Sequence, residues 1–302
     1  MTTLMDEDLL STARNLKGRV VLITGGGNGV GREASILFAK YGARVVIGDV
    51  DVKGGNWARQ ECEKVGKLLG GGAIFKRCDV SSWEEQVALF TAAVETYWRI
   101  DCVVINAGMN TLLALHIILM SSRRYGFFTP MYRYTNPPAK PKLGILDVNL
   151  VGAIYTAGLA QHYLLQNEGP RGSIIFVGSM TSFNPVGKVE IYTASKHGLL
   201  AFHDSLHHVL AEQGIHSAII CPHVMNTGVL DVSSLLGVAG VPLTPVPRVA
   251  KTILHAASEQ ETRSDSGAIY VLPDAGPALR VACGELDNIH EVVKERVERM
   301  IV

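Results

Sequence analysis

The sequence predicts a single α/β domain, in which a doubly wound parallel sheet of about seven strands carries helices on both faces. Short runs rich in β-branched residues alternate with longer amphipathic segments, and this alternation is typical of βαβ units that build one parallel sheet. Most of the short runs are apolar throughout, as expected of strands that are covered on both faces. A chain of 302 residues, 47% of them hydrophobic, has enough apolar material for one such core.

The expected elements follow one another along the chain. Seven segments read as strands: 20–24, 44–49, 73–77, 102–106, 173–177, 216–221 and 268–272. The main helical patterns cover 29–41, 82–97, 143–168, 191–213 and 245–258, and Ser82 with Glu85 is expected to form a capping box at the second of them. Four segments fall outside the alternation. We expect them to be an N-terminal extension (1–17), an insertion (110–142), a substrate loop (223–247) and a C-terminal tail (273–302).

Composition and charge exclude several classes of protein. Lys plus Arg and Asp plus Glu number 28 each, and no dense basic run is interleaved with aromatic residues, so nucleic acid is not an expected partner. The five cysteines are widely spaced and form no CxxC pair, which favours a reducing compartment. The N-terminal residues lack the pattern of a secretory signal, and the longest apolar stretch, 112–120, is too short to span a bilayer. We therefore expect a cytoplasmic protein without a membrane span.

A glycine-rich turn follows the first expected strand and opens into the first helix, with the sequence Thr24-Gly25-Gly26-Gly27-Asn28-Gly29-Val30-Gly31. Glycines here permit a tight turn and let backbone N–H groups approach a pyrophosphate, whose charge is favoured at a helix N-terminus. The alternative is a flexible glycine loop, which the position between a buried strand and an amphipathic helix disfavours. The turn therefore predicts a Rossmann-type dinucleotide site.

Two aspartates that follow expected strands are candidates for the adenosine half of the dinucleotide. Asp49 closes the second strand, where a carboxylate can accept hydrogen bonds from ribose hydroxyls and repel the 2′-phosphate of NADP. It therefore favours NAD. The alternative is that Asp49 only caps a helix that begins near Asp51. Asp79, after the third strand, could meet the adenine amino group or cap the helix ahead of Ser82.

Tyr192 and Lys196 are the candidate catalytic pair. A spacing of four residues on an expected helix places both side chains on one face. A tyrosine has an ordinary pKa of about 10, so a base that works near neutral pH needs a cation beside it. Ser179, just past a strand, could hydrogen-bond a substrate oxygen, and Asn149 could position a water that relays protons. A structural amide in the core is the alternative role for Asn149.

These residues together resemble the short-chain dehydrogenase/reductase family. The resemblance covers about residues 16–275 and rests on Thr24-Gly25-x-x-x-Gly29-x-Gly31, Asn106-Ala107-Gly108, Asn149, Ser179 and Tyr192-x-x-x-Lys196, which occur in the order and on the elements that the family shows. Within the family, the sequence resembles the NAD-dependent secondary-alcohol dehydrogenases of the hydroxyprostaglandin dehydrogenase type.

The resemblance implies a role for each of these positions. Tyr192 would be the general acid/base, Ser179 would orient the substrate oxygen, and Lys196 would lower the tyrosine pKa and hold the nicotinamide ribose. Asn149 would anchor the water of a proton relay. The remaining positions would bind the cofactor: Gly25, Asn28, Gly29, Val30 and Gly31 at the phosphates, Asp79 and Val80 at the adenine, Asn106 with Ala107 and Gly108 at the adenosine ribose, and Met225 and Thr227 at the nicotinamide carboxamide.

The sequence departs from the family pattern in three places. Ile105 stands where the family often has asparagine, which is a mild change. His223 follows Pro222 where the family usually has glycine, and its Cβ could alter the backbone beside the nicotinamide. The segment between Gly108 and Asn149 is longer than expected, and we expect the excess to be a passive surface insertion.

The sequence thus predicts reversible hydride transfer between NAD and a secondary alcohol or ketone. Two alternatives are a dinucleotide-binding regulatory protein without catalysis and an NADPH-dependent ketoreductase, which Asp49 disfavours. We expect a small-molecule substrate and a homo-oligomer, dimer or tetramer, because 143–168 and 191–213 carry extra apolar residues. No metal is expected, since His203 and His207 lack a third ligand nearby in the sequence.

Overall fold

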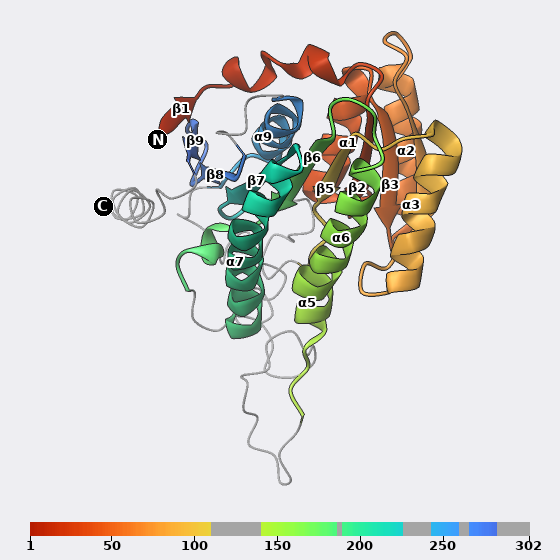
Figure 1. The fold of residues 1–302 in the computed structure, drawn as a ribbon. Coiled ribbons are helices and arrows are strands. Elements are labelled where there is room, and N and C mark those ends of the chain that lie inside the picture. Colours follow the sequence, from red (N-terminus) through yellow and green to blue (C-terminus); the bar gives the residue numbers. More distant parts are fainter. Residues whose placement is uncertain (110–139, 186–188, 226–242, 260–265, 283–302) are drawn as a thin grey trace.

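The computed structural model describes residues 1–109, 140–185, 189–225, 243–259 and 266–282, and the strands in these residues form one sheet (Figure 1). The order across the sheet is β1-β9-β8-β7-β6-β5-β2-β3-β4. The bounds are β1 Thr2–Leu4, β2 Val20–Thr24, β3 Arg44–Asp49, β4 Gly72–Arg77, β5 Cys102–Ile105, β6 Gly172–Val177, β7 Ile215–Pro222, β8 Ala268–Leu272 and β9 Ala278–Val281. Neighbouring strands from β4 to β8 run parallel, whereas β9 is antiparallel to β8 and β1 is antiparallel to β9.

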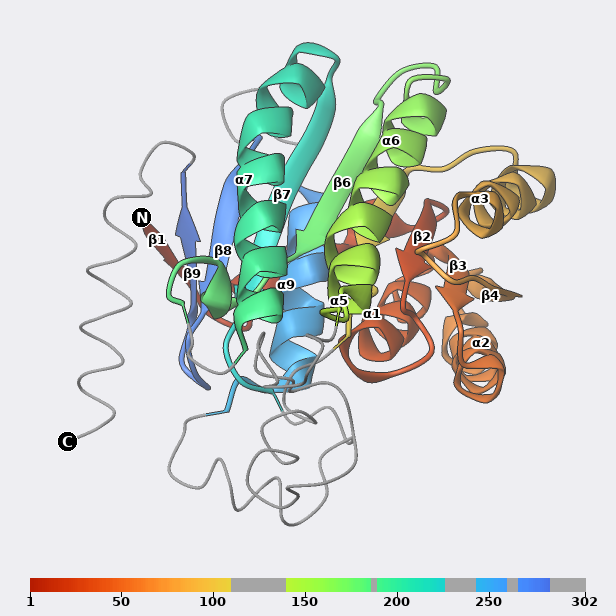
Figure 2. The ribbon, with the colours of Figure 1, turned by 90° about the horizontal axis from the view of Figure 1, so that it is seen from below.

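Helices cover both faces of this sheet. They are α1 Gly29–Lys40, α2 Val52–Gly66, α3 Trp83–Tyr97, α6 Gly152–Leu164, α7 Glu190–Glu212 and α9 Val246–Ser258. Figure 2 looks along the layers and places α3, α6 and α7 on one side of the strands and α1, α2 and α9 on the other. This is the doubly wound α/β arrangement that the sequence predicts.

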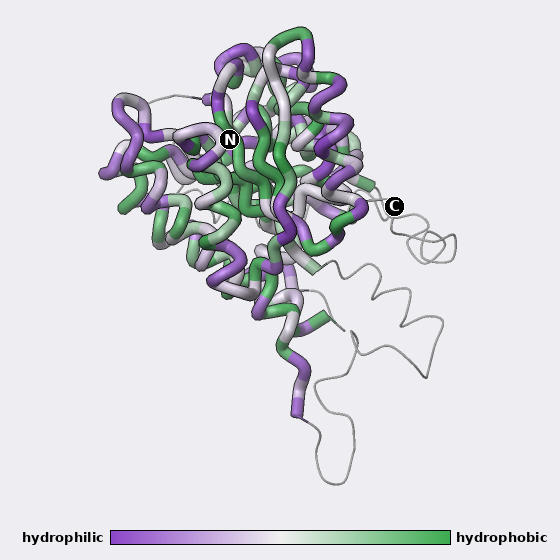
Figure 3. The backbone as a smooth tube through the Cα atoms, turned by 90° about the vertical axis from the view of Figure 1, so that its right-hand side faces the viewer, coloured by the Kyte–Doolittle hydropathy of each residue, from purple (hydrophilic) through white to green (hydrophobic). Residues whose placement is uncertain are grey.

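The core follows from the alternation of side chains along each buried strand. On β2, Val20 and Leu22 pack with α3, α6 and α7, whereas Val21 and Ile23 pack with α1, α2 and α9. Both sets are apolar because neither face of the sheet meets solvent. Figure 3 shows the result as a hydrophobic centre inside a more hydrophilic outer layer of helices and turns.

The seven expected strands are confirmed, and two further strands are present. β1 lies in the expected N-terminal extension and β9 lies in the expected C-terminal tail, so parts of both segments extend the sheet. β1 has three residues and β9 has four, which is too short for a period-2 pattern to stand out in the sequence. Their pairing, Thr3 with Leu279, brings the two ends of the described chain together.

The N-terminal segment continues from β1 as two 3₁₀-helices, η1 Asp8–Leu10 and η2 Ala13–Leu16, which pack on α9. Leu9 and Leu16 are buried in the same apolar cluster as α9. Asp6 forms ion pairs with Arg248 and Lys251 of α9. Residues 1–17 are therefore part of the domain rather than an appendage.

The helical pattern at 143–168 is not one regular helix. It consists of α5 Gly144–Leu146, a π-helical turn η3 Asp147–Val151 and then α6. The capping box that the sequence predicts at Ser82, at the start of α3, is only half formed. Ser82 Oγ accepts the N–H of Glu85, but the Glu85 carboxylate accepts the N–H of Asp79 instead of the N–H of Ser82.

Several expectations fall on residues that the structure does not describe. They are nearly all of the insertion 110–142, most of the substrate loop 223–247 with Thr227, and the tail beyond 282. In the ranges given above, the longest helices remain too short or too polar to cross a membrane.

Candidate functional site

The predicted site residues gather at the carboxyl ends of the parallel strands. The glycine turn follows β2, Asn106 follows β5, Ser179 follows β6 and His223 follows β7. β2 and β5 are neighbours in the sheet. The strands that follow β2 extend the sheet on one side, and those that follow β5 extend it on the other. Open α/β sheets bind ligands at such a switch point, because the turns there diverge and leave a crevice.

The glycine turn is shaped for close approach of backbone to backbone. Gly25 has φ +68°, a conformation that side chains other than glycine rarely adopt. A Cβ on Gly31 would lie 2.2 Å from Gly25 O and 2.4 Å from Asn106 Nδ2. The start of α1 is therefore pressed against the turn.

Asn106 fixes this turn from the neighbouring strand. Its Nδ2 donates to Thr24 O and to Gly25 O, both at 3.0 Å. In return, Thr24 Oγ1 accepts the N–H groups of Asn106 and Ala107 at 3.1 and 3.2 Å. The sequence did not reveal this role of Thr24. A threonine at the end of a buried strand could have indicated it, because a buried hydroxyl needs hydrogen-bond partners.

Asp49 points back to the glycine turn. Its Oδ2 accepts the N–H of Gly27 at 2.8 Å, and its Oδ1 accepts the N–H of Asp51 at 2.9 Å. The helix cap belongs to Asp51, whose Oδ1 accepts the N–H groups of Lys53 and Gly54. The alternative that Asp49 merely caps α2 is therefore wrong, and its carboxylate borders the turn that would hold the cofactor.

Asp79 and Val80 lie at the end of β4. Asp79 Oδ1 accepts hydrogen bonds from the hydroxyl and the N–H of Ser81, which hold the pKa of this carboxyl below its usual range. The cap of α3 is Ser82, so Asp79 is not the cap. Val80 is buried against Gly152, where a Cβ would lie 2.8 Å from Val80 O. The close approach holds the β4 turn against the start of α6.

Tyr192 and Lys196 lie in the first turns of α7, as the spacing predicts. Lys196 Nζ is 5.9 Å from the centroid of the Tyr192 ring and donates to Val177 O at 2.8 Å. The lysine side chain is 6% exposed, whereas Tyr192 is partly exposed. Burial lowers the pKa of Lys196 to about 8, so the ammonium is still the major form at neutral pH.

Ser179 and Cys221 adjoin this pair. Ser179 begins the 3₁₀-turn η4 Met180–Ser182, and its Oγ accepts the N–H of Thr181 at 3.1 Å, a bond that does not use the hydroxyl hydrogen. The η4 turn packs on α7. Cys221 of β7 is fully buried beneath Gly178, and burial raises the pKa of its thiol to about 12. The lysine therefore has a neutral thiol rather than an anion beside it.

Asn149 lies at the centre of the π-helical turn and is buried. Its Oδ1 accepts the N–H of Met109 at 2.8 Å, and its Nδ2 donates to Ser195 Oγ at 3.2 Å. Ser195 Oγ in turn donates to Tyr192 O at 2.7 Å. The structure thus connects Asn149 with the tyrosine through Ser195, a serine between Tyr192 and Lys196 to which the sequence assigned no role. π-helical turns inside α-helices occur frequently at functional sites.

His223 and Met225 follow β7. His223 donates its N–H to Leu272 O at 2.9 Å and has no positive φ, so the replacement of glycine by histidine does not strain the backbone. Met225 packs on the apolar cluster of α1 and α9. The remaining predicted contact, Thr227, lies outside the described residues.

The histidines of α7 do not form a metal site within the described ranges. His203 is fully buried against Phe176, with 5.2 Å between the ring centroids, and burial lowers its pKa to about 3. The His203 and His207 rings lie 6.1 Å apart. A histidine that stays neutral inside the core packs as an aromatic side chain.

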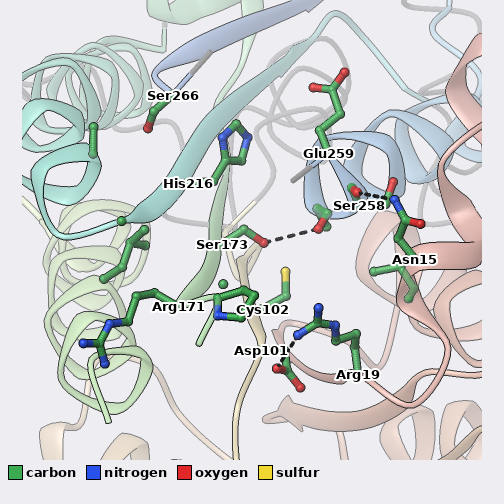
Figure 4. A pocket seen from close by; sticks show the side chains of 17 residues that line it. Asn15, Arg19, Asp101, Cys102, Arg171, Ser173, His216, Ser258, Glu259 and Ser266 are labelled. Carbon is green, nitrogen blue, oxygen red and sulfur yellow. Dashed lines mark hydrogen bonds and ion pairs between the residues drawn. The ribbon is translucent and has the colours of Figure 1, made fainter. Parts of the chain in front are cut away.

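A cavity of ≈ 140 Å³ opens at the opposite, amino edge of the parallel strands (Figure 4). Its charged groups already have partners: Arg19 pairs with Asp101, Arg171 donates to Asn167 O, and Glu259 accepts a hydrogen bond from Tyr270 and pairs with His255. None of the predicted site residues lines it. The candidate site is therefore the one at the carboxyl edge, where the glycine turn and the tyrosine and lysine pair lie.

Comparison with known proteins agrees with this geometry. Residues 19–235 match the family model of short chain dehydrogenases. The chain belongs to the short-chain dehydrogenase family. The match covers all of the motifs named above, and the strands β1, β8 and β9 lie outside it.

Individual short-chain dehydrogenases resemble the chain over most of its length. It is 30% identical to the short-chain dehydrogenase/reductase ascJ of Acremonium egyptiacum, over 80% of this chain and 74% of that protein. It is 28% identical to the NAD(+)-dependent 15-hydroxyprostaglandin dehydrogenase of Macaca fascicularis, over 72% of each. The NADP-dependent dehydrogenase clz5 of Cochliobolus lunatus is 30% identical, over 68% of this chain and 71% of that one.

A solved structure from Sinorhizobium meliloti 1021, described as a short-chain alcohol dehydrogenase, superposes with a TM-score of 0.65 at 23% identity and covers 85% of this chain and 95% of its own. At this identity the likeness concerns the fold. Relatives in the family use NAD or NADP, so membership alone does not decide which of the two this chain prefers.

Proposed function

We propose that this short-chain dehydrogenase transfers a hydride reversibly between NAD and a secondary alcohol or ketone, with Tyr192 as the general acid/base. The observation that carries the proposal is the buried ammonium of Lys196, one helical turn from Tyr192 and held by Val177 O at the end of β6. A cation in a buried, low-dielectric environment lowers the pKa of a neighbouring tyrosine, because it stabilises the phenolate.

Each of the other residues has a task that its environment supports. Tyr192 would take the proton of the substrate hydroxyl, and Ser179, whose Oγ–H is not used in its bond to Thr181, would donate to the same oxygen. Asn149 would hold a water that passes the proton on from Lys196. The bound nicotinamide would supply the hydride acceptor in oxidation and the hydride donor in reduction.

The residues at the glycine turn fit a dinucleotide. Gly25 and Gly31 allow the turn to pack closely against Ala107 and the start of α1, where a Cβ would clash, and Asn106 fixes the turn. Gly25, Asn28, Gly29, Val30 and Gly31 would hold the phosphates, Asp49 and Asn106 with Ala107 and Gly108 the adenosine ribose, Asp79 and Val80 the adenine, and Met225 with Thr227 the carboxamide. We propose NAD rather than NADP, because a 2′-phosphate would place about two negative charges near Asp49.

We further propose that the chain forms a homo-oligomer through the outer face of α6 and α7, which lie side by side (Figure 2). Large apolar side chains are exposed there, Ile154 and Leu165 on or just after α6 and Val209 on α7. A dimer or tetramer in sedimentation velocity supports this face, whereas a monomer excludes it. Cys62, Cys78, Cys102 and Cys221 are unpaired, which supports the expected reducing, cytoplasmic setting.

The central test is the Tyr192→Phe variant, assayed by NADH appearance with a panel of secondary alcohols. General base catalysis contributes about 10²- to 10⁴-fold, so the variant should lose turnover by that factor and still bind NADH. Tyr163→Phe is the matched control, because Tyr163 lies near the C-terminal end of α6, stacked on Phe90, and its variant should turn over normally. Unchanged turnover in Tyr192→Phe refutes the proposal.

Two other functions make different predictions in the same experiments. A regulatory protein that only binds the dinucleotide would bind NADH but oxidise no member of the panel. An NADPH-dependent ketoreductase would bind NADPH more tightly than NADH in a fluorescence titration. The second outcome would remove the argument from Asp49 and leave that from Tyr192 intact.

A further inference from the structure

We propose that Ser195 is a positioning residue whose hydroxyl fixes Tyr192 and Asn149 relative to one another. The inference rests on the proposed function, because it assigns Ser195 to the residues that would carry that function. Ser195 would touch neither substrate nor cofactor. It is 0% exposed and lies in the second turn of α7, on the side that meets the π-helical turn η3.

The hydroxyl of Ser195 makes two bonds at once. It donates to Tyr192 O at 2.7 Å and accepts from Asn149 Nδ2 at 3.2 Å. A hydroxyl has a single hydrogen, so the direction of both bonds is determined: the amide donates to the serine and the serine donates to the carbonyl. One oxygen atom therefore connects the backbone of Tyr192 with the side chain of Asn149.

The amide of Asn149 depends on this serine. Its Oδ1 is held by the N–H of Met109 at 2.8 Å, but the second bond to that residue, from Nδ2 to Met109 O, measures 3.5 Å. Ser195 Oγ is thus the nearer of the two acceptors for Nδ2. Without it, a buried donor would keep only one long hydrogen bond, and the side chain could rotate.

The start of α7 also depends on it. Val189, the residue that precedes the helix, supplies no side-chain cap, so the first turn lacks the usual stabilisation from an N-cap. The bond from Ser195 to Tyr192 O lies within this turn. Lys196 follows in sequence and is anchored separately to Val177 O. Loss of the serine hydroxyl would therefore move Tyr192 relative to an ammonium that stays in place.

A buried serine can also serve helix stability alone, and the chain contains a matched example. Ser258 donates to His255 O, three residues back, at 3.0 Å, and its oxygen lies 2.6 Å from Thr12 Oγ1. It is 1% exposed and lies at the far end of α9, away from the glycine turn and Tyr192. Ser258→Ala thus loses the same kinds of bond as Ser195→Ala, without any link to the proposed site.

The first experiment compares Ser195→Ala with Ser258→Ala and the unchanged chain, using the secondary alcohol of the panel with the highest kcat/KM. We expect kcat to fall about 10-fold or more in Ser195→Ala, since small displacements of reacting groups have effects of this size, with little change in NADH binding. The acidic limb of the pH profile should move to higher pH, because a tyrosine farther from the ammonium is a weaker acid. Ser258→Ala should change neither.

A second readout needs no substrate. Tyrosinate absorbance, measured as the difference between a protein and the same protein carrying Tyr192→Phe, gives the titration of this one phenol. We expect the Tyr192 titration to move to higher pH when Ser195→Ala is introduced. If Ser195→Ala fails to fold, Ser195→Cys keeps a similar volume with weaker hydrogen bonds, and it should show the same changes to a smaller extent.

The third experiment is a double-mutant cycle of Ser195→Ala with Asn149→Ala, scored on kcat. Because Ser195 acts partly through Asn149 and partly through its bond to Tyr192 O, its loss should lower kcat by a smaller factor once Asn149→Ala is present than in the unchanged chain. Losses of kcat that simply add in the double variant overturn the inference. It is also overturned if Ser195→Ala folds but keeps the kcat of the unchanged chain and an unshifted Tyr192 titration. Failure of the proposed function would give a different result from failure of this inference, because Tyr192→Phe would then keep its turnover.

Discussion

Asp49 is held at the edge of the glycine turn by two backbone N–H groups, from Gly27 and Asp51, so its negative charge has a fixed position. Asp49→Ser should raise the ratio of NADPH to NADH affinity by on the order of 10- to 100-fold, because it removes a like charge close to the 2′-phosphate. Fluorescence titration with both nucleotides measures the ratio.

Asp51→Asn is the control for Asp49→Ser. Asparagine caps a helix about as well as aspartate, and the variant removes one negative charge at nearly the same place. The ratio of affinities should stay within about twofold in this control, because Asp51 is turned to α2 and to Asn28 rather than to Gly27. An equal change in both variants would mean that net charge, not the position of Asp49, sets the preference.

Lys196 should make stability depend on alkaline pH. Burial lowers its pKa from 10.5 to about 8, so the unfolded chain binds more protons than the folded one between these values. Below pH 8 both states are protonated and the cost of burying the charge is constant. As pH rises through the window, stability should increase by up to about 3 kcal/mol.

Other groups titrate in the same window, and the buried cysteines act in the opposite direction, since burial raises their pKa. The contribution of Lys196 is therefore read as the difference between the unchanged chain and Lys196→Met in urea unfolding. As pH rises, the free energy of unfolding of the unchanged chain should increase relative to that of the variant. A constant difference would mean that the ammonium is not buried in solution.

At the level of single residues, short spacings were the reliable guide. The interval between Tyr192 and Lys196 lies within one helix, so the sequence was sufficient to pair them. Asp49 had two readings from sequence, and only the position of Asp51 resolved them, because both carboxylates are near the start of α2. The sequence placed Ser195 beside this pair but did not reveal its role, since its second partner, Asn149, is remote in the chain.

Among the elements, α1 shows how a glycine can be required by its neighbours. Gly31→Ala should destabilise the protein by about 1–3 kcal/mol, because the added methyl would meet the backbone at Gly25 O. It should also weaken NADH binding by more than about 10-fold, since the turn must open to relieve the contact. Thermal unfolding and fluorescence titration measure the two effects.

Gly158 is the matched control, in the interior of α6. It is exposed, and a Cβ there would meet nothing within 4 Å. Gly158→Ala should stabilise the protein by about 0.5–1 kcal/mol, the usual gain for this change in a helix, and leave NADH binding unchanged. Destabilisation of similar size in both variants would contradict the proposed packing of α1 on the glycine turn.

The elements were predictable where their periodicity is local. Both ends of all seven expected strands, and the start of α3, agree with the sequence to within one residue, because apolar runs and caps are set by neighbouring residues. The π-helical turn at Asn149 was not predicted. A π-helical turn has one extra residue but needs no particular residue type, so it leaves no pattern in the sequence. The hydrogen bonds of Asn149 to Met109 and Ser195 stabilise it, and both partners are remote in the chain.

For the whole molecule, the N-terminal segment is the part that local patterns described least well. Leu9 is fully buried under α9, so Leu9→Ala should lower the free energy of unfolding by about 2–5 kcal/mol. Leu68→Ala, at a leucine that is 94% exposed, should change it by less than about 0.5 kcal/mol. Urea unfolding compares the two, and equal effects would mean that residues 1–17 do not pack on the domain.

The sequence alone determined the alternation of strands and helices, the glycine turn, the tyrosine and lysine pair and the family, because each of these is written in residues close together in the chain. Only the tertiary structure decided that both ends of the described chain join the sheet edge, that Asp49 faces the turn, and that Ser195 connects Asn149 with Tyr192. These features depend on groups that folding brings together from remote positions, and no local pattern records which remote group a side chain will meet.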